Sequence, residues 1–274
     1  MSHITVTYKG STSMRINMQW LSDALNQSCK AEDIKSNTIA LGKESVEIGD
    51  LFEISGENFT DTAVLENSND KMDYIGSQLQ SKHKIKVEGD CGHYVGAQLA
   101  GGKLKIKGST LDYTACSMKK GIIKIGGDCG HYAGSAMAGT KKGMSGGTLL
   151  VHGNTGDFTG DLMRRGLIMV EGDIGDYCAS RMIAGTITNL GGIGKQVGVG
   201  MRRGTLLFPH KPDDMCSGFK DCGRHNLGFL TLLLHELRRF ESRFQSLHPM
   251  RRRVQVYEGD MAVGGQAEIL IWIG

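Results

Sequence analysis

Paired basic residues recur in this sequence and are its feature best suited to binding chemistry. The pairs are Lys119–Lys120, Arg164–Arg165 and Arg202–Arg203. Evenly spaced cationic pairs predict a track for an extended anion, because the attractions of the pairs add along one ligand. Polyglutamate, phosphate chains and nucleic acid all fit the charge pattern. A solvated edge, or salt bridges to a partner protein, is the alternative interpretation, since exposed charge pairs contribute little singly.

Cysteine and histidine also recur together, as Cys91 with His93 and Cys129 with His131. In a stack of strands with one strand between the two copies, about 9–10 Å would separate them. Zn–S bonds of about 2.3 Å require two sulfur ligands within about 4.6 Å of each other. One metal ion therefore cannot bridge the copies, and the intervening segment offers Thr110 and Asp112 in place of the cysteine and histidine. We predict no metal site.

No motif in this chain predicts catalysis. The sequence contains neither the GxSxG pattern of a nucleophilic serine nor the HExxH pattern of a zinc hydrolase. The segment Gly191–Gly194 (GGIG) resembles part of a nucleotide-binding loop, but the repeat described next already requires glycine there. We predict no catalytic residue.

The elements that position these residues belong to a 19-residue repeat, most visible as GDCGHY at Gly89–Tyr94 and Gly127–Tyr132. Five repeat positions have a constant character: apolar at 1 and 3, glycine at 5, aromatic at 10 and Leu or Met at 15. Position 1 is Ile85, Leu104, Ile123, Leu149, Ile168, Ile187 and Leu206, and position 15 is Leu99, Met118, Met137, Met163, Met182 and Met201. The basic pairs occupy positions 16 and 17 of alternate repeats. One seven-residue insertion, around Thr140–Gly146, interrupts the period.

This repeat predicts an all-β fold, a right-handed parallel β-helix with one 19-residue coil per repeat. Apolar residues at positions 1 and 3 form a short strand with one buried face. Nineteen residues are too few for a helical crossover, and stacked coils share a core that one coil cannot form alone. Parallel crossovers favour the right hand. We expect Tyr94, Tyr113, Tyr132, Phe158 and Tyr177 to form one internal column.

The flanks differ from the repeat and divide the chain into three parts. Residues 1–45 are predicted to form a small β-rich N-terminal cap, in which Ile4–Tyr8 and Met14–Met18 alternate like the strands of a hairpin. Residues 46–208 form the β-helix. Residues 209–274 form a C-terminal appendage of a helix at Leu227–Phe240, which we expect to plug the open end or to bind a partner, and of closing strands.

Composition narrows the class of protein. The chain has 274 residues, 40 of them glycine, and a formal net charge of +3, which makes nucleic acid an unlikely partner. No apolar run is long enough to span a membrane, and the N-terminus lacks the apolar region of a signal peptide. Seven cysteines without paired spacing predict reduced thiols and a cytoplasmic location.

The repeat pattern G-D-x-G-x-Y-x-G-x-x-M-x-x-G resembles the GXGXG β-helix domain. That domain occurs at the C-terminus of the glutamate synthase large subunit and as a separate β-helix subunit in formylmethanofuran dehydrogenase. The stretch Met201–Phe208 (MRRGTLLF) is similar to this separate type. Gly223–Leu230 (GRHNLGFL), with the leucine-rich helix after it, resembles the version in the formyltransferase/hydrolase complex of methylotrophic bacteria.

The resemblance implies a non-catalytic scaffold subunit that works with the other subunits of such a complex. The complex transfers a formyl group between tetrahydromethanopterin and a methanofuran-like carrier and releases formate, and this chain itself binds no cofactor. A glutamate-rich carrier arm is a natural ligand for Lys119, Lys120, Arg164, Arg165, Arg202 and Arg203. Two alternatives stay open: the β-helix subunit of a molybdenum or tungsten formylmethanofuran dehydrogenase, and an independent module that binds polyanions.

Overall fold

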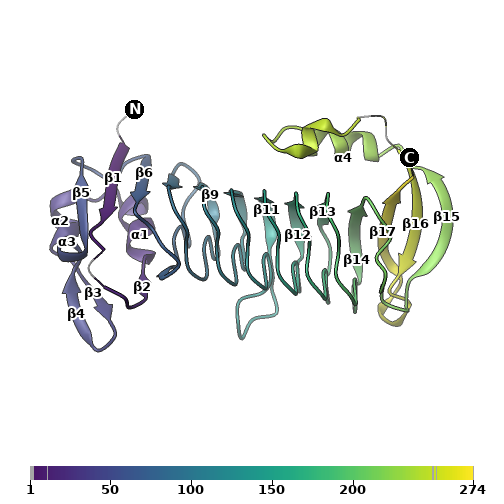
Figure 1. Ribbon diagram of the computed structural model, residues 1–274, viewed down its shortest axis with the longest axis horizontal. Coiled ribbons are helices and arrows are strands. Elements are labelled where there is room, and N and C mark those ends of the chain that lie inside the picture. The colour runs from purple at the N-terminus through teal and green to yellow at the C-terminus, as the bar shows by residue number, and fades with distance from the viewer. Residues whose placement is uncertain (1–2, 11, 249, 251, 274) are drawn as a thin grey trace.

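The computed structural model describes residues 3–10, 12–248, 250 and 252–273, and the chain is mostly β with few helices. Thirteen of the described strands form one mixed sheet, in the order β15-β16-β17-β14-β13-β12-β11-β10-β9-β8-β6-β1-β5. Eight of these strands run parallel in chain order, from β6 to β14, and we call residues 62–208 the coil stack (Figure 1). They are β6 (Thr62–Glu66), β8 (Lys84–Val87), β9 (Ala100–Ile106), β10 (Lys120–Ile125), β11 (Ser145–Val151), β12 (Arg165–Val170), β13 (Thr186–Asn189) and β14 (Arg203–Phe208).

The strand register follows the repeat of the sequence. Ile85 lies opposite Leu104, and Ile123 lies opposite Leu149, so that equivalent residues of successive coils are neighbours. In β8 the side chains alternate between exposed lysine and buried Ile85 and Val87. One face of each strand therefore points into the stack, and the other faces outward.

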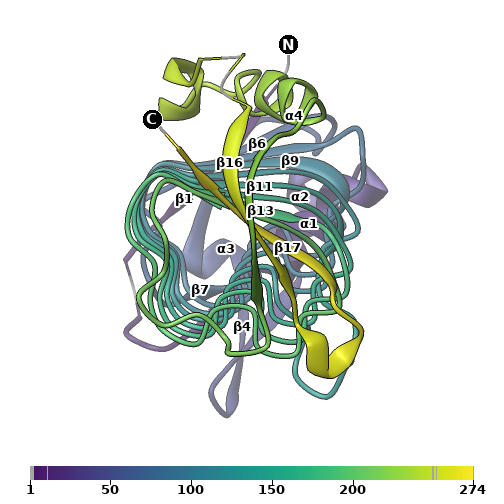
Figure 2. The same ribbon diagram turned by 90° about the vertical axis from the view of Figure 1, so that its right-hand side faces the viewer.

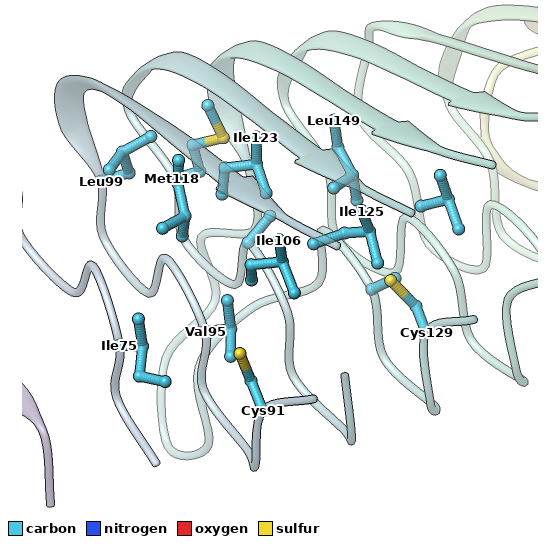
Figure 3. Close-up of a cluster of buried hydrophobic side chains, with 14 of the residues drawn as sticks. Ile75, Cys91, Val95, Leu99, Ile106, Met118, Ile123, Ile125, Cys129 and Leu149 are labelled. Atoms are coloured by element: carbon cyan, nitrogen blue, oxygen red, sulfur yellow. The ribbon is translucent and has the colours of Figure 1, made fainter. Parts of the chain in front are cut away.

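The interior of the stack is filled by columns of apolar side chains (Figure 3). Repeat positions 1, 3 and 15 are buried, as predicted, with one correction at position 15. Met144 is fully buried there, whereas Met137 is only partly buried. Arg164 N donates to Met144 O, just as its equivalent Lys119 N donates to Leu99 O. Met144 is therefore the equivalent of Leu99, at position 15. The insertion is therefore residues 137–143 and not residues 140–146.

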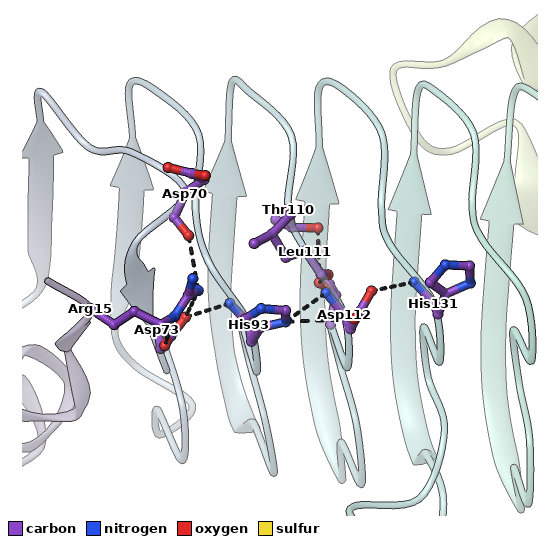
Figure 4. A network of polar contacts seen from close by, with 9 residues as sticks. Arg15, Asp70, Asp73, His93, Thr110, Leu111, Asp112 and His131 are labelled. Atoms are coloured by element: carbon purple, nitrogen blue, oxygen red, sulfur yellow. Dashed lines mark hydrogen bonds and ion pairs between the residues drawn. The ribbon is translucent and has the colours of Figure 1, made fainter. Parts of the chain in front are cut away.

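Polar side chains tie each coil to the next along two outer columns. In the first column, the Asp90 carboxylate accepts the Ser109 N–H at 2.7 Å, and Asp128 accepts the Asn154 N–H at 2.7 Å. In the second column, each side chain before the last accepts the backbone N–H of the next residue of the column. Its members are Asp73, His93, Asp112, His131, Asp157, Asp176 and Lys195, and Figure 4 shows the part from Asp73 to His131. Each acceptor replaces water on an N–H group that strand pairing leaves free.

These columns explain the glycines of the GDCGHY motif. A Cβ at Gly130 would lie 2.3 Å from Asp112 Oδ1, and one at Gly153 would lie 2.2 Å from Asp128 Oδ1. Neither glycine has a positive φ, so the requirement is for space and not for an unusual backbone conformation. Gly130 before His131 and Gly153 before Asn154 thus leave room for the acceptor of the preceding coil. Asp112 is an exception, since Leu111 precedes it.

The aromatic residues form a column, but the expectation that it is internal is wrong. The rings of Tyr74, Tyr94, Tyr113, Tyr132, Phe158 and Tyr177 stack with centroids 4.8–5.0 Å apart. All six residues are at least partly exposed, and Tyr177 is 39% exposed. Each has a φ between 58° and 64°. A residue with a left-handed backbone breaks the alternation of side chains along a strand. Tyr94 and its equivalents therefore point outward, on the same side as the preceding residue, such as His93.

The N-terminal part contains helices as well as strands. It therefore has more helix than the β-rich cap that the sequence predicted. Strand β1 (His3–Tyr8) pairs with β6 and with β5 (Phe52–Ser55), not with the Met14–Met18 segment as expected. Short β2 pairs with β7, and β3 pairs with β4. The remaining elements are β2 (Ile16–Asn17), α1 (Gln19–Gln27), α2 (Ala31–Lys35), β3 (Thr38–Leu41), β4 (Glu44–Glu47), α3 (Ile48–Leu51) and β7 (Met72–Asp73). Strand β1 thus continues the main sheet and covers one end of the coil stack.

The C-terminal part covers the other end with strands, and its helix lies along the side of the stack (Figure 2). The strands are β15 (Lys220–Asn226), β16 (Arg253–Gly259) and β17 (Gln266–Trp272), with the turn η2 (Met261–Val263) between the last two. Residues 227–248, which we call the arm, hold α4 (Leu230–Leu237) and η1 (Arg243–Ser246). Leu230, Leu234, Leu237 and Phe244 pack on Leu150, Met169 and Leu207 of the outer sheet face. The helix therefore does not plug the open end.

Candidate functional site

The three basic pairs lie where strands β10, β12 and β14 begin, and together they form what we call the basic ladder. Lys119, Arg164 and Arg202 precede the strands by one residue, and Lys120, Arg165 and Arg203 are their first residues. In each coil the first residue of the pair donates its N–H to position 15 of the coil before, to Leu99, Met144 and Met182. The repeated bond aligns the pairs on one edge of the stack, with rungs about 10 Å apart.

The coils between the rungs carry small or apolar residues. They are Ser145–Gly146 and Ile183–Ala184, where the corrected register puts Ser145 opposite Arg165. Regular spacing of the repeat would place Ala138–Gly139 in the first of these coils, but those residues belong to the insertion. Exposed Lys141 and Lys142 are also in the insertion, which is fixed to the stack by a hydrogen bond from Ser117 Oγ to Lys142 O (2.7 Å).

The ladder is a source of uncompensated positive charge. Five of its six residues are exposed, and Arg164 is half-buried. No carboxylate of the described residues forms an ion pair with any of the six. The Nε of Arg164 is buried and has no hydrogen-bond partner within the described chain. The charge of the ladder is therefore available to an anionic ligand or partner mainly through its five exposed side chains.

The recurring cysteine and histidine residues point to opposite sides of the coil wall. Cys91 and Cys129 are buried in the core, and burial raises the pKa of Cys129 to about 12. Its Sγ accepts the hydroxyl of Thr110 at 3.2 Å. His93 and His131 lie on the outer surface, and the Nδ1 of each accepts a backbone N–H, so Nε2 carries the proton in the neutral ring. A cysteine and its neighbouring histidine therefore cannot share a ligand.

Two further surfaces were not predicted from the sequence. Lysines repeat on the outer face of β8, β9 and β10, and the alternating KxK pattern at Lys84–Lys86 and Lys103–Lys105 was a signal for them. The outer face of the arm presents apolar side chains: Phe229 is 42% exposed and Leu232 is 76% exposed. The leucine-rich helix was predicted, but its periodicity could not show which leucines the stack covers.

Among the described residues, no helix is long and apolar enough to cross a membrane. The same residues contain no group of three or more His, Cys, Asp and Glu side chains that could hold a metal ion.

Comparison with known proteins finds a matching family model and a similar solved structure. The family model described as the GXGXG motif matches residues 26–220. A chain of the formyltransferase/hydrolase complex (FhcABCD) from Methylorubrum extorquens, crystallised with methylofuran, is similar with a TM-score of 0.90 and 33% sequence identity. The match covers 98% of this chain and 100% of that chain. No curated protein matches the sequence.

Proposed function

The chain belongs to the GXGXG family, and on that basis we propose that it is a non-catalytic scaffold subunit of a formyltransferase/hydrolase complex. In such a complex, partner subunits transfer a formyl group between tetrahydromethanopterin and a methanofuran-like carrier and hydrolyse it to formate. The observation that carries the proposal is the match along the full length of both chains, at 33% identity. A scaffold role also agrees with a chain whose repeated residues serve stacking.

The proposal includes three finer points. The coils wind as a right-handed parallel β-helix, which the 19-residue strand register and the usual hand of parallel crossovers support. The chain holds no cofactor of its own, and tetrahydromethanopterin binds to other subunits. The protein works in the cytoplasm, where its seven free cysteines stay reduced.

Isolation of the tagged chain from its native source tests the proposal. We expect the transferase and hydrolase subunits to co-purify, identified by mass spectrometry, with hydrolysis of the formylated carrier in the same fraction. The exposed apolar face of the arm around Leu232 is expected to contact a partner subunit. Leu232→Glu should then weaken the assembly about 30-fold, because a charge in an apolar contact costs about 2 kcal/mol. Met14→Glu, at a residue 53% exposed on the N-terminal part, is the control and should assemble normally.

Two results would contradict the proposal. Co-purification with subunits that hold iron–sulfur clusters and molybdenum or tungsten would identify a dehydrogenase instead. A monodisperse chain that recovers no partner and binds polyanions would identify an independent module.

We further propose that the basic ladder guides the glutamate-rich arm of the carrier. The ladder extends over about 20 Å, so one extended carboxylate chain can touch all three rungs. Each contact contributes about 1 kcal/mol or less and is screened by salt, but one ligand that meets all three sums the contributions. Arg164 and Arg165 form the middle rung, so a ligand that spans the ladder must pass them.

Arg164→Ala combined with Arg165→Ala should therefore raise the apparent KM for the carrier about fivefold in the intact complex, and it should weaken the salt dependence of KM. The matched control is Arg224→Ala with Arg253→Ala, two exposed arginines of the C-terminal strands. Steady-state kinetics at several salt concentrations measures both effects. An unchanged KM would overturn the carrier role. Dissociation of the complex would then assign the ladder to an interface between subunits, and an intact complex would assign it to a solvated edge.

A further inference from the structure

Five lysines cover one part of the outer face of the coil stack, on β8, β9 and β10. Lys84 lies opposite Lys103, and Lys105 lies between Lys86 and Lys124 in the strand register. Neighbouring strands are about 4.8 Å apart, so these like charges face one another directly. Such pairs destabilise a sheet. An anionic ligand on this face would relieve the repulsion.

The same face continues along the stack in apolar residues. At the positions equivalent to Lys86, Lys105 and Lys124, strands β11, β12 and β14 carry Leu150, Met169 and Leu207. The arm packs on those three residues and buries them fully. Its Phe240 lies at the boundary, where Lys124 Nζ is 6.0 Å from the ring centroid. The chain therefore covers the apolar part of this face with its own arm and leaves the lysine part open.

The open part is a groove with one apolar wall. It has a volume of about 500 Å³, and Phe240 and Ile122 line it beside the lysines. Glu236 and Arg239 also line the groove and pair with each other, and Glu88 of the neighbouring surface pairs with Lys107. In the part of the chain that the structure describes, none of the five lysines forms an ion pair.

We infer that this lysine groove binds an extended acidic segment of a partner polypeptide. Three strands span about 10 Å, the length of three or four extended residues. Such a segment supplies carboxylates to the lysines and an apolar side chain to Phe240 and Ile122. A single-stranded nucleic acid could also supply charge and stack a base on Phe240, so the experiment below compares the two ligands. The inference rests on the proposed function in requiring a partner polypeptide.

Peptide binding to the purified full chain tests the chemistry. The probe is a fluorescent octapeptide with four glutamates and one leucine, and its glutamine counterpart is the reference. Lys84→Gln, Lys103→Gln and Lys105→Gln together should weaken binding of the acidic peptide at least tenfold. The control, Lys30→Gln with Lys43→Gln and Lys220→Gln, removes the same charge from exposed lysines outside the groove and the ladder and should not change binding of the peptide. The inference would be overturned if both variants lost the same affinity for the acidic peptide. It would also be overturned if a single-stranded oligonucleotide bound more tightly than the peptide.

A second experiment compares the rate at which each lysine is acylated in the free chain and in the native complex. We expect Lys84, Lys86, Lys103 and Lys105 to react at least fivefold more slowly in the complex, whereas Lys43 reacts equally in both. If the complex assembles and is active but the groove lysines react as in the free chain, the inference that the groove binds a partner is wrong. The proposed function would then still stand. If no complex assembles, the proposed function fails, and the peptide experiment decides the groove alone.

Discussion

Replacement of Gly130 by alanine is expected to lower the free energy of unfolding by about 3 kcal/mol. The new Cβ would lie 2.3 Å from Asp112 Oδ1 and 2.9 Å from the backbone N of the same residue. Asp112 Oδ1 accepts the His131 N–H at 2.8 Å, so the clash also breaks a bond between coils. Overpacking costs about 1–3 kcal/mol and a lost hydrogen bond about 1 kcal/mol. Chemical denaturation measures the change.

Two further variants isolate the cause. Gly228→Ala is the control, because Gly228 has no positive φ and a Cβ there would meet nothing within 4 Å. It should change the free energy of unfolding by less than about 0.5 kcal/mol. Asp112→Ala removes the oxygen with which the new Cβ clashes. The losses in free energy of unfolding of Asp112→Ala and Gly130→Ala should therefore sum to more than the loss in the double variant. Strict additivity would refute the explanation of the glycine by the acceptor column.

Leu234→Asp is expected to release the arm from the coil stack while the stack stays folded. Leu234 is fully buried against the outer sheet face, in an apolar cluster separate from the core inside the coils. A carboxylate cannot stay in that cluster unpaired, and losing the leucine removes about 1.5–3 kcal/mol of burial. Trypsin should then cleave at Arg238, Arg239 or Arg243 at least tenfold faster, since opening the arm becomes easier by more than about 1.4 kcal/mol.

The neighbouring leucine provides the control for this experiment. Leu232 has the same side chain on the same helix but is 76% exposed, so Leu232→Asp should leave the cleavage rate of the free chain unchanged. The backbone N of Arg243 donates to Glu171 Oε1 at 2.6 Å and holds the end of the arm independently. If Leu234→Asp instead lowered the unfolding midpoint of the whole chain, the arm would be part of one cooperative unit with the stack.

The sequence by itself determined the strands, their register and most of the core. A 19-residue period with apolar residues at positions 1, 3 and 15 is a local pattern, and parallel stacking repeats the same contacts in every coil. It also determined that the basic pairs share one edge, because residues at the same position of a regular stack must align. The closing strands, β16 and β17, followed from their own alternation.

Only the tertiary structure decided how the outer surface is organised. Tyr94 and its equivalents have a left-handed backbone, which reverses the side on which they lie, and the letters of the repeat do not show φ. The position of the insertion depended on hydrogen bonds between coils, since Met137 and Met144 satisfy the spacing equally well. The arm lies along the side of the stack because Leu150, Met169 and Leu207 are apolar where β8, β9 and β10 carry lysine, and that division appears only once the strands are placed next to one another.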